Sequence, residues 1–301
     1  MTRVRRTKVQ VETIERQIID VLRIDHPQTV RNIYYQLVNP RLAEPIPKTA
    51  AGYGVVQHRL VVMRRSGVIP YSWIADSTRR GYHIATYSGP ADIIRHAAAF
   101  YRADLWSTSE TYVEVWVESR SLAGVLHGVC EELAVSLYPS GGFSSLSQTY
   151  EAALQINSAV IHGRKKRAMV IYVGDYDPAG VLIDRDIESK LRQHLDVRVD
   201  LEFNRIAINE YQIKLLDLPT LPRKTTDRRR LDISHTVEAE AMPTHILKAL
   251  LRDKVESFLP AGALAAAKAA EDSEREGLNA LAAVLSGQHD KHDLRNLLAR
   301  K

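Results

Sequence analysis

The chain has 301 residues, of which 45% are hydrophobic and 26% are charged, and it carries a formal net charge of +5 at pH 7. This composition excludes a wholly disordered chain, a collagen and a bundle of membrane helices. The single cysteine, Cys130, excludes an internal disulfide and a zinc cluster. We therefore expect a globular protein of two domains in a reducing, cytoplasmic compartment, with no membrane contact.

The basic residues gather in short runs. One such run is typical of a solvated loop, but five together favour a polyanionic partner such as nucleic acid. The runs lie at residues 3–8, 64–65, 79–80, 164–167 and 223–230.

Three helices are predicted in the N-terminal part. Apolar residues recur at helical spacing over 9–25, 29–38 and 49–65. Two short strands are expected at 68–74 and 82–87. Three helices followed by a basic hairpin are typical of a winged helix-turn-helix domain; a generic small helical domain is the alternative.

In a winged-helix domain, expected here over residues 1–88, the third helix enters the major groove and the hairpin contacts the DNA backbone. The helix over 49–65 has apolar residues on one side and basic residues on the other. The DNA-binding candidates are therefore the arginines of this helix and of the hairpin: Arg59, Arg64, Arg65, Arg79 and Arg80.

Strand and helix patterns alternate after residue 110, which predicts an α/β domain with a mostly parallel sheet over residues 111–260. A helix over 90–106 is expected within a connecting segment, residues 89–110, and an alanine-rich helical tail is expected over 261–301. The remaining expected elements are strands at 112–117, 169–174 and 197–203 and helices at 122–135 and 181–194.

Two aspartates, Asp175 and Asp177, follow the apolar strand at 169–174. Residues i and i+2 of an extended segment point to the same side, at the end of a parallel sheet where active sites form. Their charges repel unless a cation lies between them, and Mg²⁺ prefers such oxygen ligands. The alternative is that Asp177 caps the next helix and Asp175 is a surface residue.

A third carboxylate, Glu118, ends the strand at 112–117. A strand ending in V-E-S and a later strand ending in D-Y-D-P-A-G resemble the two motifs of the Toprim fold. This resemblance implies that Glu118, Asp175 and Asp177 hold Mg²⁺ for breaking and joining nucleic-acid strands.

A tyrosine pair lies in the second predicted helix, in the sequence Arg31-Asn32-Ile33-Tyr34-Tyr35. It resembles the R-x-x-Y-Y segment of the topoisomerase VI A subunit and the related meiotic double-strand-break proteins, and the resemblance implies that Tyr35 attacks DNA. Arg31 lies one helical turn earlier and could stabilise a phenolate or hold the phosphate. The alternative is that both tyrosines are core residues, as we expect for Tyr34.

Further segments, at 205–208, 218–229 and 237–243, look like parts of stand-alone A-subunit proteins. The resemblance places Lys224 and Arg229 near DNA phosphates. Glu238 or Glu240 could add a metal ligand, or form a salt bridge at a strand end. The chain shows no Gly-rich nucleotide loop, so a separate ATPase subunit is an expected partner.

The sequence thus predicts Mg²⁺-dependent cleavage of double-stranded DNA, with Tyr35 joined to the 5′ phosphate and religation as the reverse attack, in a nucleoid-associated cytoplasmic protein. Two alternatives stay open: a Toprim nuclease that uses water, and a non-catalytic DNA-binding protein. Cutting two strands favours a homodimer. The helix over 90–106 is expected to hold Tyr35 away from the carboxylates of its own chain, so we expect sites shared between protomers, as in the resembling family.

Overall fold

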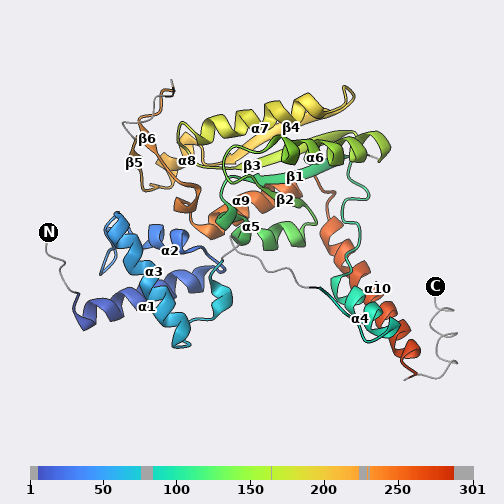
Figure 1. Ribbon diagram of the computed structural model, residues 1–301, viewed down its shortest axis with the longest axis horizontal. Coiled ribbons are helices and arrows are strands. Elements are labelled where there is room, and N and C mark those ends of the chain that lie inside the picture. The colour runs from blue at the N-terminus through green and yellow to red at the C-terminus, as the bar shows by residue number, and fades with distance from the viewer. Residues whose placement is uncertain (1–5, 76–83, 164, 224–228, 230, 288–301) are drawn as a thin grey trace. The chain divides into compact units, whose positions relative to one another are not determined.

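The computed structural model describes residues 6–75, 84–163, 165–223, 229 and 231–287 (Figure 1). The chain divides into two compact units. The first comprises Met1–Arg79 and Glu110–Glu256, and the second comprises Arg80–Ser109 and Ser257–Lys301.

The elements alternate in type after residue 110. The helices are α1 (Lys8–Ile24), α2 (Val30–Leu37), α3 (Ala50–Arg65), α4 (Pro90–Phe100), α5 (Arg120–Glu132), α6 (Leu146–Asn157), α7 (Gly180–His194), α8 (Glu210–Leu215), α9 (Thr244–Glu256) and α10 (Ala263–Leu285). Single turns are η1 (Tyr71–Trp73), η2 (Ser158–His162) and η3 (Ala239–Ala241). The strands are β1 (Thr111–Val117), β2 (Ser136–Pro139), β3 (Arg167–Val173), β4 (Asp200–Ala207), β5 (Leu221–Pro222) and β6 (His235–Thr236).

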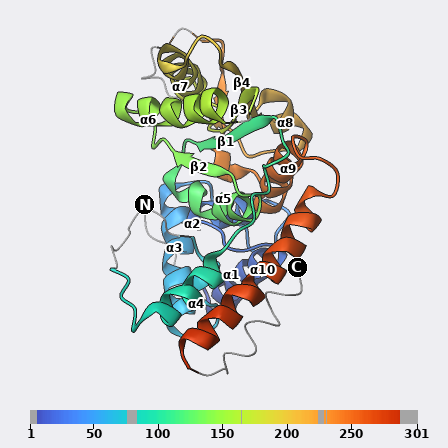
Figure 2. The ribbon, with the colours of Figure 1, turned by 90° about the vertical axis from the view of Figure 1, so that its right-hand side faces the viewer.

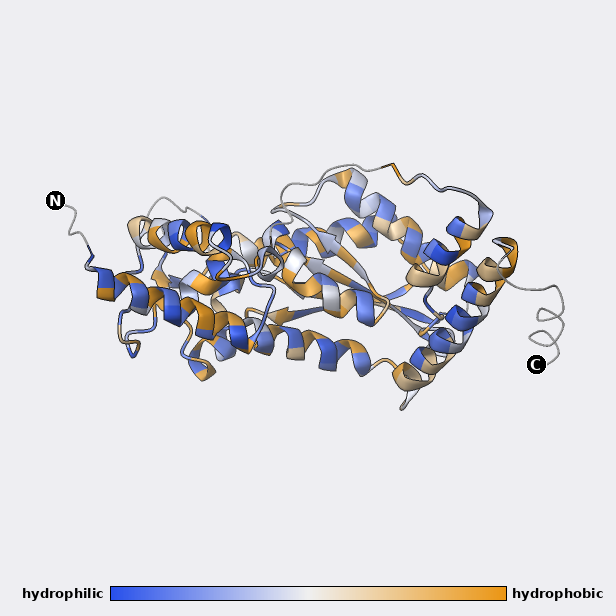
Figure 3. Cartoon of the chain, turned by 90° about the horizontal axis from the view of Figure 1, so that it is seen from below, coloured by the Kyte–Doolittle hydropathy of each residue, from blue (hydrophilic) through white to orange (hydrophobic). Residues whose placement is uncertain are grey.

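The three N-terminal helices are confirmed to within two residues of their predicted ends. A threonine side chain caps each one: Thr7 for α1, Thr29 for α2 and Thr49 for α3. Such a cap satisfies an otherwise unpaired backbone N–H and stabilises the helix by about 1 kcal/mol. Figure 3 shows apolar and polar residues sharing each helix, as expected for helices with one buried side.

The predicted strand at 68–74 is wrong. The segment forms the 3₁₀ turn η1, and only Ile74 makes an isolated parallel bridge, to Gln28. The apolar and aromatic residues that suggested a strand include Ile69 and Ile74, which are both buried from a loop and a turn. Of the second predicted strand, residues 84–87 have no regular structure, and the rest lies outside the described residues together with Arg79 and Arg80.

The predicted parallel α/β sheet is confirmed. Its order is β2-β1-β3-β4, and every neighbouring pair is parallel. Helices α6 and α7 cover one face, and α5 and α9 cover the other (Figure 1). The sheet therefore has a core on each side and one edge at which all carboxyl ends meet.

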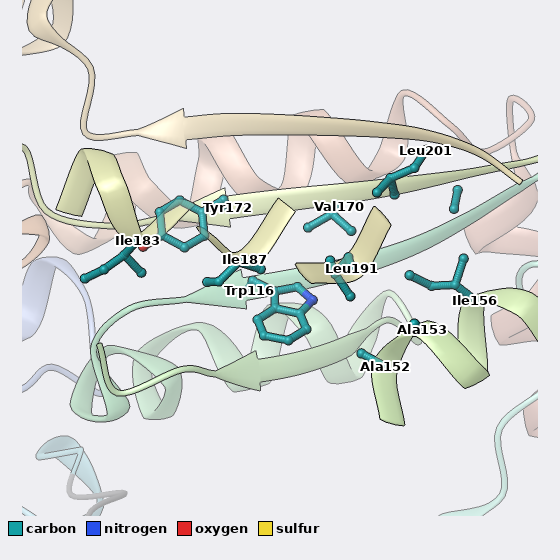
Figure 4. Packing of buried hydrophobic residues seen from close by; sticks show 11 residues of the cluster. Trp116, Ala152, Ala153, Ile156, Val170, Tyr172, Ile183, Ile187, Leu191 and Leu201 are labelled. Carbon is teal, nitrogen blue, oxygen red and sulfur yellow. The ribbon is translucent and has the colours of Figure 1, made fainter. Parts of the chain in front are cut away.

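The core under α6 and α7 contains large aromatic side chains from β1 and β3, Trp116 and Tyr172 (Figure 4). Ile183, Ile187 and Leu191 of α7 pack onto them at helical spacing. Burying aliphatic side chains of this size contributes about 1.5–3 kcal/mol each.

Several elements of the α/β part are absent from the sequence prediction: β2, α6, α8, β5, β6 and α9. Strand β2 is short and none of its four residues is fully buried. The buried residues of α6 include Thr149, Ala152 and Ala153, which give a weak apolar signal. Strand β4 begins at Asp200 because Val197, although apolar, is fully exposed.

The second unit is helical, as predicted for the residues of the tail that the structure describes. Helices α4 and α10 lie side by side (Figures 1 and 2). Arg95 Nη1 donates to Ser286 Oγ at 3.1 Å, and Arg275 Nη2 donates to the Tyr101 carbonyl at 2.8 Å. The predicted connecting helix ends at Phe100 rather than at residue 106. Among the described residues, no helix has the length and hydrophobicity needed to cross a membrane.

A carboxyl group, Glu114, is fully buried in the middle of β1. Its oxygens accept from Tyr112 Oη at 3.0 Å and Trp116 Nε1 at 3.1 Å, and Tyr138 of β2 also hydrogen-bonds to it. Burial raises the pKa of Glu114 to about 7, although these donors oppose the shift.

Glu114 should make the protein less stable as pH rises. The folded chain keeps the proton of Glu114 while the unfolded chain loses it, so stability falls between about pH 4.5 and 7. The group accounts for on the order of 3 kcal/mol across that interval. We expect Glu114→Gln to remove this part of the decline, measured by urea unfolding at a series of pH values. Parallel wild-type and variant profiles would contradict this prediction.

Candidate functional site

Strands β1 and β3 end side by side, with Val117 opposite Val173. Glu118 follows β1, and its backbone N–H donates to the Val173 carbonyl at 2.9 Å. Its Oε2 accepts from the backbone N–H of Asp175 at 3.0 Å. The structure therefore brings together two of the three predicted metal ligands at the predicted edge of the sheet.

The third predicted ligand, Asp177, contacts the start of α7. Its Oδ1 accepts from the backbone N–H of Gly180, the first residue of α7, at 2.6 Å, although the N-cap position itself is Ala179. A Cβ at Gly180 would lie 2.2 Å from the Asp175 carbonyl oxygen and 3.2 Å from Glu118 Oε2. Glycine is thus needed where the helix approaches the carboxylates.

Arg205 of β4 holds in place the loop after β3 that carries Asp175 and Asp177. Its Nε donates to Asp184 Oδ2 at 2.6 Å, and its two other nitrogens donate to backbone carbonyls of the loop and its surroundings. The carbonyls are those of Gly174 at 3.1 Å, Asp175 at 3.1 Å, Ile208 at 3.2 Å and Gly180 at 2.8 Å. This side chain fixes the backbone from which Asp175 and Asp177 project, a role that sequence reasoning missed.

Two more carboxylates come from the turn at 238–240. The backbone N–H of Ala239 donates to Asp175 Oδ1 at 2.8 Å. Glu240 is 4% exposed, and its Oε1 accepts from Ser119 Oγ at 2.7 Å and Ser121 Oγ at 3.1 Å. Glu238 pairs with Arg31 at 2.9 Å, which is the salt bridge that the sequence left open.

These carboxylates act on one another electrostatically. Burial raises the pKa of Asp175 to about 8, and the charges of Glu118, Glu240 and Glu238 contribute to the increase. Burial, with the charge of Asp177, also raises the pKa of Glu118. Each site carboxyl would be easier to ionise with a cation beside it.

The donor set suits a hard cation such as Mg²⁺, since every candidate ligand is a carboxylate oxygen. Glu118, Asp175 and Asp177 each bind a backbone N–H through one oxygen, which orients the carboxylate. Within the described part of the chain, however, no three Asp, Glu, His or Cys side chains already form a closed metal-binding group. A metal would have to draw the carboxylates closer together.

Helix α2 lies against the turn at 238–240 of the same chain, called the acidic turn below because it carries Glu238 and Glu240. Arg31 reaches Glu238, and Asn32 Nδ2 donates to the Glu240 carbonyl at 3.0 Å. The expectation that the segment at 90–106 holds these parts of one chain apart is therefore wrong. The reason is that both belong to the same compact unit, whereas α4 belongs to the other.

The two tyrosines of α2 differ in their surroundings. Tyr34 Oη donates to the Thr49 carbonyl at 3.3 Å, and its ring meets that of Tyr53 edge-on, as expected of a core residue. Tyr35 is 7% exposed. Burial raises the pKa of Tyr35 far above that of an ordinary phenol, and the negative charge of Glu238 raises it further.

A lysine that sequence reasoning missed, Lys48, lies beside Tyr35. Its Nζ is 5.4 Å from the centre of the Tyr35 ring and donates to the Thr220 carbonyl at 2.8 Å. Burial lowers the pKa of Lys48, and the charge of Glu238 opposes the change. Lys48 belongs to no basic run and precedes α3, so only the fold shows its proximity to Tyr35.

The predicted DNA-binding arginines are not all alike. Arg59 is half-buried and pairs with Glu15 of α1 at 3.2 Å. Arg64 donates to the Leu60 carbonyl and its guanidinium lies 5.6 Å from the Tyr71 ring centre, while Arg65 is exposed. Arg229 is exposed, and its carbonyl accepts from Arg223. Lys224 lies outside the described residues.

Comparison of the chain with family models, curated proteins and solved structures found no match. The geometry itself defines an α/β protein with a buried acidic site at the carboxyl edge of a parallel sheet, next to a tyrosine on an N-terminal helix.

Proposed function

We propose that the chain is a metal-dependent DNA-cleaving enzyme that uses Tyr35 as its nucleophile, with a winged-helix-like N-terminal part and a Toprim-type α/β part. One observation carries the proposal: Arg31 of α2 pairs with Glu238, whose charge also acts on Tyr35, and the backbone N–H of the adjoining Ala239 donates to Asp175. A nucleophile, a cation and a carboxylate cluster thus meet in one chain, which is the combination that phosphodiester transfer needs.

Glu118, Asp175 and Asp177 would hold Mg²⁺, with Glu240 next to them. When bound, the ion would offset negative charge on the phosphoryl group and on the leaving oxygen. Arg205 keeps the loop of Asp175 fixed, and Ser119 and Ser121 hold Glu240. The chain's own residues therefore fix the acidic edge before DNA binds.

Glu238 would act as the base, since it is the carboxylate whose charge acts on the Tyr35 hydroxyl. The phenol oxygen attacks phosphorus as its proton passes to Glu238, the bond to the 3′ oxygen breaks, and that oxygen takes a proton from water. The products are a 5′-phosphotyrosyl link and a 3′ hydroxyl. Arg31 and Lys48 supply positive charge around the phosphate, and Arg65 is an exposed candidate for backbone contact.

A water-dependent nuclease is the second candidate. The burial of Tyr35 favours it, because a phenol that is hard to ionise is a poor nucleophile. In that case water attacks and Tyr35 is a core residue.

The test is cleavage of an end-labelled duplex with Mg²⁺ or with EDTA, followed by denaturing gels. We expect label on the 3′ end of the cut strand to move with the protein only when Mg²⁺ is present, because the fragment joined to the protein through its 5′ phosphate carries that end. Cut DNA with free 5′ phosphates would support the nuclease. DNA binding without cleavage in any divalent cation would indicate a non-catalytic binding protein.

Mg²⁺ should stabilise the fold, because it neutralises the repelling carboxylates. Binding at a hundredfold excess over its Kd would contribute about 2.7 kcal/mol. We expect the double variant Asp175→Asn with Asp177→Asn to lose this response in thermal unfolding. The control, Asp20→Asn with Asp253→Asn, removes two exposed charges elsewhere and should keep it. An equal Mg²⁺ response in both double variants would place the ion elsewhere.

We further propose a homodimer in which each chain carries a complete site, working in the cytoplasm on nucleoid DNA and, for strand passage, with a separate ATPase subunit. Two nucleophiles related by a two-fold axis match the symmetry of duplex DNA.

Mixing Tyr35→Phe chains with Asp175→Ala chains should therefore restore no cleavage. Each chain would lack one half of its own site, and α2 contacts the acidic turn within one chain. The measurement is nicking of supercoiled plasmid after subunit exchange is verified by differently tagged chains. Recovered nicking would show that the tyrosine of one protomer works with the metal of its partner.

A further inference from the structure

A pocket of about 600 Å³ opens beside Tyr35. One wall is the end of α2 with the loop at 38–41, and the other is the loop at 216–220 that follows α8. Residues 241 and 243, next to the acidic turn, complete it. The volume lies within the range of small-molecule sites, and the mechanism above uses only Tyr35 of its lining.

The lining combines apolar surface with polar groups. Tyr35, Leu218 and Ala241 are buried, while Asn39 and Asp217 are exposed at the mouth. A pocket that joins apolar side chains to the amides of Gln36 and Asn39, the guanidinium of Arg41 and the carboxylate of Asp217 suits a heterocycle with hydrogen-bonding edges. A nucleobase has these properties, since its faces are apolar and its edges carry donors and acceptors.

The loop at 216–220 is held in shape. The N–H of Leu216 donates to the Gln212 carbonyl at 2.9 Å, and the N–H of Leu218 donates to the Ile213 carbonyl at 3.0 Å. Asp217, between them, has φ +49°. A left-handed residue directly after the C-cap is the usual way for a helix to end, and it fixes the course of the loop that follows α8.

Lys48 connects the pocket to the nucleophile. It binds the carbonyl of Thr220 in the pocket wall, and its Nζ lies 5.4 Å from the centre of the Tyr35 ring. A phosphate at Lys48 would therefore have the phenol on one side and the pocket on the other.

We propose that this pocket binds the base of the DNA nucleotide next to the phosphate that Tyr35 attacks, with Lys48 contacting the phosphate. The proposal rests on the proposed function. It implies that one base leaves the duplex stack, at a cost that base-flipping proteins regularly meet. The pocket then fixes the scissile phosphate against Tyr35 and adds a preference for certain bases there.

The first test uses deoxynucleoside 5′-monophosphates as probes, in EDTA, with saturation-transfer NMR. We expect transfer to base protons, and about tenfold weaker binding by Leu218→Trp, which fills the pocket. Leu215→Trp is the matched control: Leu215 lies on α8, is 76% exposed and is outside the pocket lining, so its variant should bind as wild type does. Asp217→Gly accepts the same backbone conformation, so this variant should stay folded. It should weaken the saturation transfer to the base protons, because the carboxylate in the pocket lining is lost.

The proposal would be contradicted if wild-type protein gave no saturation transfer to the base protons. It would also be contradicted if Asp217→Gly and a folded Leu218→Trp gave the same transfer as wild type. Neither metal nor cleavage is needed for this binding, so it is measured separately from adduct formation. Nucleotide binding without any protein–DNA adduct would support the pocket as a nucleotide site and contradict the proposed function. If an abasic site next to the cleaved phosphate left the adduct yield unchanged, the proposed function would stand and only the base-binding role of the pocket would be contradicted.

Discussion

Tyr35→Phe is expected to abolish covalent protein–DNA adducts while leaving DNA affinity nearly intact. The substitution removes only the hydroxyl, which is the attacking group in the proposed reaction, so adduct yield should fall by roughly a thousandfold or more. Glu238 keeps its ion pair with Arg31, and phenylalanine keeps the buried ring, so the fold should lose no more than about 1 kcal/mol. Adducts are counted on denaturing gels, and affinity is measured by fluorescence anisotropy.

Tyr34→Phe is the matched control for this substitution. Tyr34 lies in the same helix, but its hydroxyl donates to the backbone carbonyl of Thr49 rather than to a carboxylate. The variant should therefore keep wild-type adduct yield. Adducts that persist in Tyr35→Phe and disappear in Tyr34→Phe would reverse the roles of the two residues.

Arg205→Ala is expected to cost about 3–5 kcal/mol of unfolding free energy. The guanidinium is largely buried, as is its partner Asp184, which would be left as an unpaired buried charge. The loop of Asp175 would also lose the donors that hold its carbonyls, so the Mg²⁺ response should weaken in any protein that still folds. Urea unfolding with and without Mg²⁺ measures both effects.

Arg198→Ala gives the comparison for Arg205. Arg198 also pairs with an aspartate, Asp196, but its side chain is 65% exposed, and solvent screens such pairs, so the variant should be within about 0.5 kcal/mol of wild type. Removing the stranded partner as well, in Arg205→Ala with Asp184→Ala, should recover part of the loss. A cost for Arg205→Ala no larger than that for Arg198→Ala would contradict the role given to Arg205.

The elements that the sequence predicts well are those with strong local signals. Helix α1 shows Ile14, Ile18 and Leu22 on one side, and β3 is an unbroken apolar run. The proximity of Glu118 and Asp175 was also predictable, since parallel strands end at the same edge. The absence of a strand at 68–74 was not predictable, because a loop that buries Ile69 and Ile74 is as rich in apolar residues as a short strand.

What the sequence could not provide are contacts between distant segments. Arg205 lies 30 residues from Asp175, whose carbonyl it binds, and Arg31 lies 207 residues from Glu238. Such pairings depend on the packing of whole elements, not on local spacing. The same holds for Lys48, whose position over Tyr35 follows from the turn into α3.

The most direct test of the central claim is to locate the covalent link. The adduct formed on duplex DNA with Mg²⁺ would be digested with nuclease and protease, and the modified peptide sequenced by tandem mass spectrometry. The account predicts a nucleotide joined through its 5′ phosphate to Tyr35. A nucleotide on Tyr34 or another residue, or cleaved DNA that carries no peptide at all, would contradict it.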